Sequence, residues 1–256
     1  MAVHQGGEVG SDRYLIGIDD TDNLTSRGTG FCGRRLSSLL AAEGLAQPDG
    51  ITRHQLFVDP RIPYTSHNSS LCVSVDADSG KIADITEFCR DFLLRESAPG
   101  ADAGLCIAPF SAFGAELQEF GNRAKREVVT RAEAEALAQS RAVHLEGLTG
   151  DFGGVIGALA GCGLRAGARD GRFVWVMGVR RMCGVFDAET ILRTTGIQEI
   201  RSLTGEPIAG PARIETSPWP RPVMIDGRAV LLVEQATGAE SGYEWNLAPK
   251  HIIKSY

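Results

Sequence analysis

The feature that most constrains this chain lies near its start, where an apolar run ends abruptly in acidic residues. Residues 14–18 are apolar and rich in strand formers, and Asp19, Asp20 and Asp22 follow directly. This pattern predicts a buried strand whose carboxyl end presents acids to solvent. Ligands bind at that end of the strands in an open α/β sheet, so the sequence predicts a ligand site here.

Three carboxylates within four positions repel one another unless water or a cation separates them. Hard oxygen ligands suit Mg2+, which takes one or two protein carboxylates and completes its coordination with water and phosphates. A surface turn is the alternative, because Asp and Thr are common turn and N-cap residues. We interpret Asp19, Asp20 and Asp22 as metal ligands and as the catalytic carboxylates.

Two glycine-rich segments each precede a predicted helix. Backbone N–H groups and the positive end of the dipole at a helix N-terminus favour a polyphosphate, although close helix packing also explains glycines. Neither segment is a Walker A loop, because the sequence G-x-x-x-x-G-K-[ST] does not occur. The glycines that could contact a polyphosphate such as ATP are Gly28, Gly30 and Gly33 in the first segment and Gly150, Gly153 and Gly154 in the second.

Composition places the chain among ordinary globular proteins. It has 256 residues, of which 43% are hydrophobic and 23% charged, and a net charge of −6. No apolar run approaches the roughly 20 residues that a membrane-spanning helix requires, and six scattered cysteines without a C-x-x-C pair indicate reduced thiols. We therefore expect a soluble cytoplasmic protein without membrane partners, whose oligomeric state is open, and a disordered N-terminus over residues 1–12.

Three sequence blocks together carry a resemblance to a known family. They are residues 16–22, residues 59–65 with Asn68, and residues 154–160. In order and spacing they resemble the signature blocks of the archaeal isoleucine-tRNA agmatinylcytidine synthetase (TiaS) family. The resemblance implies α/β plus α+β architecture, with a kinase-like ATP-binding domain at residues 13–168. A ferredoxin-like domain at residues 169–256 follows it or is interleaved with it.

The second block adds candidate substrate-binding residues. Two prolines hold residues 59–64 extended, and a run of hydrogen-bonding side chains follows them. A surface loop between two strands is the alternative, and a structural histidine is the alternative for His67. Because the block matches the family, we interpret Tyr64, His67 and Asn68 as substrate-binding residues.

In the family, ATP with Mg2+ activates a tRNA cytidine for attack by agmatine. This chain departs from the family pattern at Cys32-Gly33-Arg34, where the family has Cys-Thr-Thr with a threonine that becomes phosphorylated. We also expect the OB-fold and zinc ribbon of the synthetase to be lacking. The resemblance thus implies a short homologue with ATP and Mg2+ as cofactors.

The function predicted from the sequence is that of an ATP-dependent transferase or ligase with a different or smaller acceptor, either a small molecule or RNA. One alternative is a stand-alone enzyme that modifies a tRNA cytidine. Another is a regulatory protein that binds nucleotide without turnover.

Overall fold

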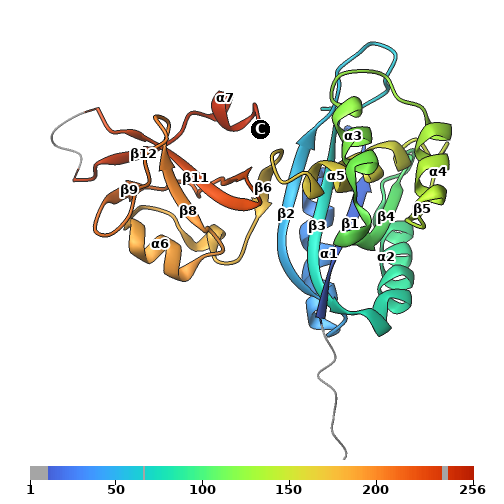
Figure 1. Cartoon of the computed structure of the whole chain (residues 1–256), viewed down its shortest axis with the longest axis horizontal. Coiled ribbons are helices and arrows are strands. Elements are labelled where there is room, and N and C mark those ends of the chain that lie inside the picture. Colours follow the sequence, from blue (N-terminus) through green and yellow to red (C-terminus); the bar gives the residue numbers. More distant parts are fainter. Residues whose placement is uncertain (1–10, 66, 238–241) are drawn as a thin grey trace, which may run out of the picture.

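The computed structural model describes residues 11–65, 67–237 and 242–256, which form two lobes side by side (Figure 1). The first lobe contains β1 (Ser11–Asp19), α1 (Thr29–Ala42), β2 (Gln47–Gln55), β3 (Ser69–Asp78), α2 (Ile82–Glu96), β4 (Gly104–Pro109), α3 (Ala115–Ala124), α4 (Arg131–Ser140), β5 (His144–Gly147) and α5 (Val155–Ala166). The second contains β6 (Arg172–Trp175), β7 (Val185–Asp187), α6 (Ala188–Thr194), β8 (Glu199–Ser202), β9 (Arg213–Glu215), β10 (Val223–Ile225), β11 (Arg228–Gln235), β12 (Trp245–Leu247) and α7 (Lys250–Ile253).

In the described part of the chain, one sheet of 12 strands runs through both lobes. Its order is β5-β4-β1-β3-β2-β6-β10-β11-β12-β9-β7, with β8 paired to β11. The predicted mixture of helices and strands is confirmed. The sheet is mostly antiparallel, however, and β1 runs antiparallel to both β3 and β4. The sequence pattern did not indicate the direction of these neighbouring strands.

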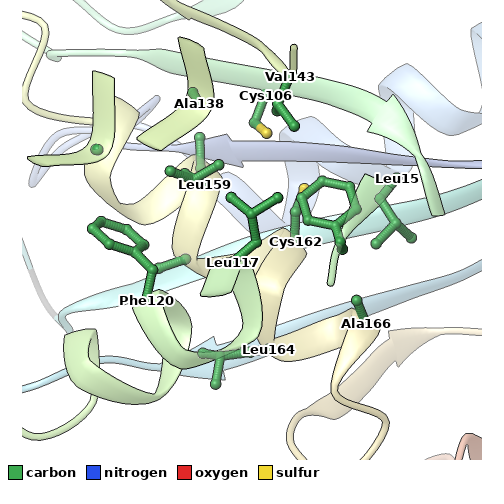
Figure 2. Close-up of a cluster of buried hydrophobic side chains, with 14 of the residues drawn as sticks. Leu15, Cys106, Leu117, Phe120, Ala138, Val143, Leu159, Cys162, Leu164 and Ala166 are labelled. Carbon is green, nitrogen blue, oxygen red and sulfur yellow. The ribbon is translucent and has the colours of Figure 1, made fainter. Parts of the chain in front are cut away.

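Strand β1 is buried on both faces, as its apolar run predicts. Ile16 and Ile18 pack with buried residues of α1 and α2, whereas Leu15 belongs to the cluster under α3, α4 and α5. Figure 2 shows Leu15 in the cluster under α3, α4 and α5, to which Leu117 and Cys162 also belong. Gly17 lets α5 approach, since a Cβ there would overlap the backbone oxygen of Ala158. Strand β1 thus lies between a layer that contains α1 and α2 and a layer that contains α3, α4 and α5.

Several local predictions hold. The sequence Thr130-Arg131-Ala132-Glu133 is typical of a capping box, and Thr130 and Glu133 form one at the start of α4. Asp226 and Gly227 both have positive φ, 48° and 78°, in the tight turn between β10 and β11, which is typical of a type I′ hairpin. Residues 47–50, Gln-Pro-Asp-Gly, have the composition of a turn, but they begin β2, with a bulge between Pro48 and Gly50.

The predicted division after residue 168 stays a prediction. Separate hydrophobic clusters fill the two lobes, and β2 joins β6 across them through the pair Arg53 and Arg172. Of the N-terminal segment expected to be disordered, residues 1–10 lie outside the described residues, and Ser11 and Asp12 already belong to β1.

The predicted reduced thiols agree with the described structure, in which all six cysteines are free and only Cys183 is exposed. No helix among the described residues has the length and apolar character needed to cross a membrane.

A buried polar chain ties β2 to the segment that leads into the second lobe. His54 Nδ1 lies 2.8 Å from Asp170 Oδ1, and His54 Nε2 lies 2.8 Å from Thr52 Oγ1. Lys125 also pairs with Asp170. Burial and the nearby cations Arg165 and Lys125 lower the pKa of His54 to about 3. A neutral ring that donates from Nδ1 to Asp170 and accepts at Nε2 from the Thr52 hydroxyl gives both ring nitrogens a partner.

We expect stability to fall in acid because of His54. Its folded pKa of about 3 lies below its ordinary value of 6.5, so the unfolded chain binds the extra proton between these values. The contribution of His54 to the free energy of unfolding should therefore drop as pH falls below 6.5, by at most about 1.4 kcal/mol per pH unit. Urea unfolding at pH 7, 6 and 5 measures this slope, which His54→Gln should reduce. His251→Gln, on an exposed position of α7, is the control; equal slopes in all three proteins would contradict the account.

Candidate functional site

A cavity of about 680 Å³ opens where β1 ends. Its walls come from segments that lie far apart in the sequence, so the fold assembles a site at the position that the acidic run predicts. The lining residues predicted from the sequence are Asp19, Asp20, Asp22, Gly28, Gly30, Tyr64, His67, Asn68, Gly153 and Gly154.

The acidic turn folds around a strained residue. Asp20 has φ 50°, a left-handed conformation that Asp and Asn tolerate better than most side chains. Asp22 accepts a hydrogen bond from Thr29 Oγ1 at 3.2 Å. Asp102, from the loop before β4, joins the group, since its charge and its backbone both affect the pKa of the Asp20 carboxylate. Asp102 Oδ1 in turn accepts the Asp151 N–H at 2.9 Å.

Crowding of these acids shows in their pKa values. Desolvation, followed by the charges of Asp102, Asp22 and Asp151, raises the pKa of Asp20 to about 6. Burial and the Asp20 charge raise the pKa of Asp19 well above its usual range. Acids that are held together against their repulsion are characteristic of functional sites, where a cation offsets the charge.

The start of α1 lines the cavity and carries backbone N–H groups that have no acceptor among the described residues. Gly28 is the N-cap and has no side chain to cap the helix, and the first turn carries no acid. Phe31 N–H bonds to the Gly28 carbonyl, while the described residues provide no acceptor for the N–H groups of Thr29 and Gly30. Uncapped N–H groups at a positive dipole end suit a phosphate.

The start of α5 contributes close contact rather than free donors. The N–H groups of Gly154, Val155 and Ile156 already bond to carbonyl oxygens of Asp102, Phe152 and Gly153. A Cβ at Gly157 would overlap the Asp19 carboxylate, so this glycine allows α5 to lie directly against the acid.

Two predicted ATP-binding glycines lie outside the cavity lining. Gly33 faces the core, where an added Cβ would overlap the Leu71 side chain. Gly150 has φ 60° and lies against the Asp102 side chain, so it shapes the loop that carries this acid.

The segment after β2 covers the opposite side of the cavity. Tyr64 is 45% exposed there. Asn68 anchors the segment, because its Nδ2 donates to the Phe57 carbonyl at 2.6 Å. Partial burial and the cations Arg53, Lys254 and Arg172 lower the pKa of His67, which keeps this ring neutral near pH 7.

Sequence reasoning missed several charged residues that line the cavity. Arg53 reaches it from β2 and donates from Nε to Ser69 Oγ at 2.8 Å. Its only sequence signal is its place on a strand next to the predicted substrate segment. The other charged residues missed are Glu127, Arg131, Glu135 and Asp151.

The carboxylates of the cavity are suited to a cation that also has phosphate and water ligands. Among the described residues, no three His, Cys, Asp or Glu side chains gather as a complete metal site. Mg2+ needs only one or two carboxylates when phosphates and water supply the rest. The raised pKa of Asp20 indicates that the site favours an added positive charge.

No protein-family model and no curated protein matches this sequence. Among solved structures, the chain is similar to a complex of TiaS with tRNA and ATP, with 21% identity over 59% of this chain and 36% of that chain, at a TM-score of 0.53. A tRNA fluorescent labelling enzyme matches with 22% identity and the same coverage, at 0.52. A complex of TiaS with tRNA, AMPCPP and agmatine matches with 20% identity over 59% of this chain, at 0.51.

These similarities define a mixed α/β protein with a TiaS-like fold over part of its length. The structural similarity to TiaS that the sequence blocks suggested is confirmed. The chain spans about a third of the length of those structures. At these identities the similarity establishes the fold, and the bound ATP and tRNA belong to TiaS.

Proposed function

We propose that this protein is an Mg2+-dependent, ATP-using phosphotransferase or ligase. The observation that carries the proposal is one cavity that combines crowded carboxylates with the uncapped N-terminus of α1. Phosphoryl and nucleotidyl transfer depend mainly on positioning and charge neutralisation, for which these parts are suited. The similarity to an ATP complex of TiaS adds support.

Each part of the cavity has a role in this proposal. One or two carboxylates from the set Asp19, Asp20 and Asp22 would hold Mg2+, which would neutralise phosphate charge when bound. The N–H groups of Thr29 and Gly30 bind phosphate oxygens, and residues 150–157 enclose the nucleotide. Tyr64, His67 and Asn68 contact the acceptor. Residues 13–168 would form the kinase-like domain and residues 169–256 the ferredoxin-like domain.

A second candidate is modification of an RNA cytidine, which is favoured by the similarity to TiaS complexes that contain tRNA. The family threonine cannot be restored simply at Gly33, because Leu71 fills the space that its Cβ would need. Whichever acceptor is used, this chain would therefore transfer the group without a phosphothreonine at position 33.

ATP turnover with Mg2+ tests the proposal, with ADP, AMP, phosphate and pyrophosphate resolved and with bulk RNA present or absent. We expect products that disappear with EDTA and in Asp22→Ala. Stimulation by RNA would favour the second candidate. Equilibrium binding of Mg2+·ATP without any product would instead support a regulatory nucleotide-binding protein, and absence of binding would refute the site.

A further inference from the structure

A cluster of cations lies where the two lobes meet. Arg53 of β2 pairs in register with Arg172 of β6. A cavity of about 260 Å³ is lined by Arg172, Arg221 and Lys254. A smaller one of about 40 Å³ shares Arg172 and Lys254 and adds Arg53, which also lines the 680 Å³ cavity. The cations therefore form a path that leads away from the acidic site.

Within the described part of the chain this cluster has no direct ion-pair partner, and only Arg53 lies near enough to carboxylates, those of Asp22 and Asp19, to feel their charge. Most other buried or half-buried arginines have acidic partners, such as Arg90 with Glu146 at 2.8 Å. No described carboxylate lies within ion-pair distance of Arg53, Arg172, Arg221 or Lys254. Burial and the charges of Arg53 and Arg221 lower the pKa of Arg172 to about 10. This repulsion destabilises the free protein unless an anion offsets it.

Trp219 holds one end of the cluster in place. The guanidinium of Arg180 lies 4.4 Å from the Trp219 ring centroid, and that of Arg221 lies 5.2 Å from it. Cation–π contacts orient the guanidinium groups and leave their N–H donors available. Trp219 thus holds Arg221 at the cavity that Arg172 and the exposed Lys254 also line.

We propose that Arg172, Arg221 and Lys254 bind a phosphate group of the acceptor substrate. A phosphate carries a charge of about −1.5 to −2 and three acceptor oxygens, so it can offset more than one cation at once. A single carboxylate would leave most of this repulsion in place. Arginine forks also match phosphate geometry in a bidentate manner.

The position of Arg53 connects this site with the proposed chemistry. Arg53 lines both the acidic cavity and the smaller junction cavity. A ligand whose phosphate lies at Arg172 would therefore extend past Arg53 toward Asp19 and Asp22. That this phosphate belongs to the acceptor substrate rests on the proposed function, whereas the phosphate site itself does not.

Calorimetric titration of the full chain with inorganic phosphate, AMP and a short mixed-sequence RNA tests the site. The variants are Arg172→Gln/Arg221→Gln and, as a control, Arg193→Gln on the exposed side of α6. We expect the double variant to weaken phosphate binding at least tenfold and the control to leave it unchanged. Asp20→Asn should also leave it unchanged, which separates this site from the ATP site.

Comparison of the three probes then shows which kind of molecule carries the phosphate. AMP binding without RNA binding identifies a small phosphate ester. RNA binding whose salt dependence loses about one unit of slope per arginine removed identifies a nucleic-acid strand. Phosphate binding that the double variant does not alter, or that Asp20→Asn abolishes, would overturn the proposal, as would failure of all three probes to bind.

Discussion

Replacing Asp20 with asparagine is expected to abolish ATP turnover and, at pH 7.5, to stabilise the ligand-free protein. The carboxylate is one of the groups proposed to hold Mg2+, so we expect turnover to fall by about 100-fold or more. Initial rates at saturating Mg2+ and ATP measure this loss. The opposite signs of the two effects make the prediction specific to a functional site.

The stabilisation follows from linkage. The pKa of Asp20 is raised from 3.8 to about 6, so the folded state prefers the neutral acid. The stability that this preference contributes is present at low pH and is lost as pH rises through 6. Asparagine keeps the neutral shape and tolerates the left-handed φ of 50°. We expect a gain of about 1 to 2 kcal/mol above pH 7, after allowance for partial exposure.

Urea unfolding at pH 7.5 and pH 5 measures the gain, which should shrink at the lower pH. Asp12→Asn is the matched control, because Asp12 is exposed at the opposite end of β1. Unchanged turnover in Asp20→Asn would refute the assignment of the site. A loss of stability in that variant would show that repulsion among the acids is not its dominant interaction.

Local patterns in the sequence predicted the elements that local physics determines. The apolar run of β1 and the capping box at Thr130 each depend on neighbours within a few positions. The turn at Asp226 and Gly227 does so as well. These features need no knowledge of the rest of the chain, which is why they could be predicted.

Strand direction depends on distant partners and could not be predicted in this way. β1 lies between β3 and β4, and both run antiparallel to it. The rule that places ligands at strand ends comes from parallel sheets, so it does not explain this site. Here the cavity forms because α5, more than a hundred residues later in the sequence, begins against Asp19.

In the candidate site, too, features set by neighbouring residues could be predicted and features set by distant contacts could not. The sequence offers Asp102 as a loop acid that could join the metal group or be solvated, and its contacts with Asp20 and Asp151 decide between the two only in the fold. Gly33 did carry a signal that favoured packing, since Gly33, Leu36 and Leu40 follow helical spacing and are all buried. A glycine within such a spacing is more consistent with close packing than with a phosphate loop.

Replacing Gly104 with alanine is expected to give the largest loss of stability. Gly104 begins β4, directly against the backbone of Gly154 and Val155 at the start of α5. An added Cβ would overlap backbone atoms, which cannot rotate away as a side chain can. Overpacking of this kind costs about 1 to 3 kcal/mol, and we expect a value at the upper end.

The same substitution should damage the site, because α5 can relieve the overlap only by moving away from β4. Gly157 would then no longer hold α5 against Asp19, and the affinity for Mg2+·ATP should fall even in molecules that remain folded. Gly114→Ala is the control, since nothing lies within 4 Å of its added Cβ; loss of the preferred N-cap glycine should cost about 1 kcal/mol or less. Equal stability of the two variants would mean that α5 does not press on β4. Lowered stability with unchanged nucleotide affinity would mean that the cavity does not depend on this contact.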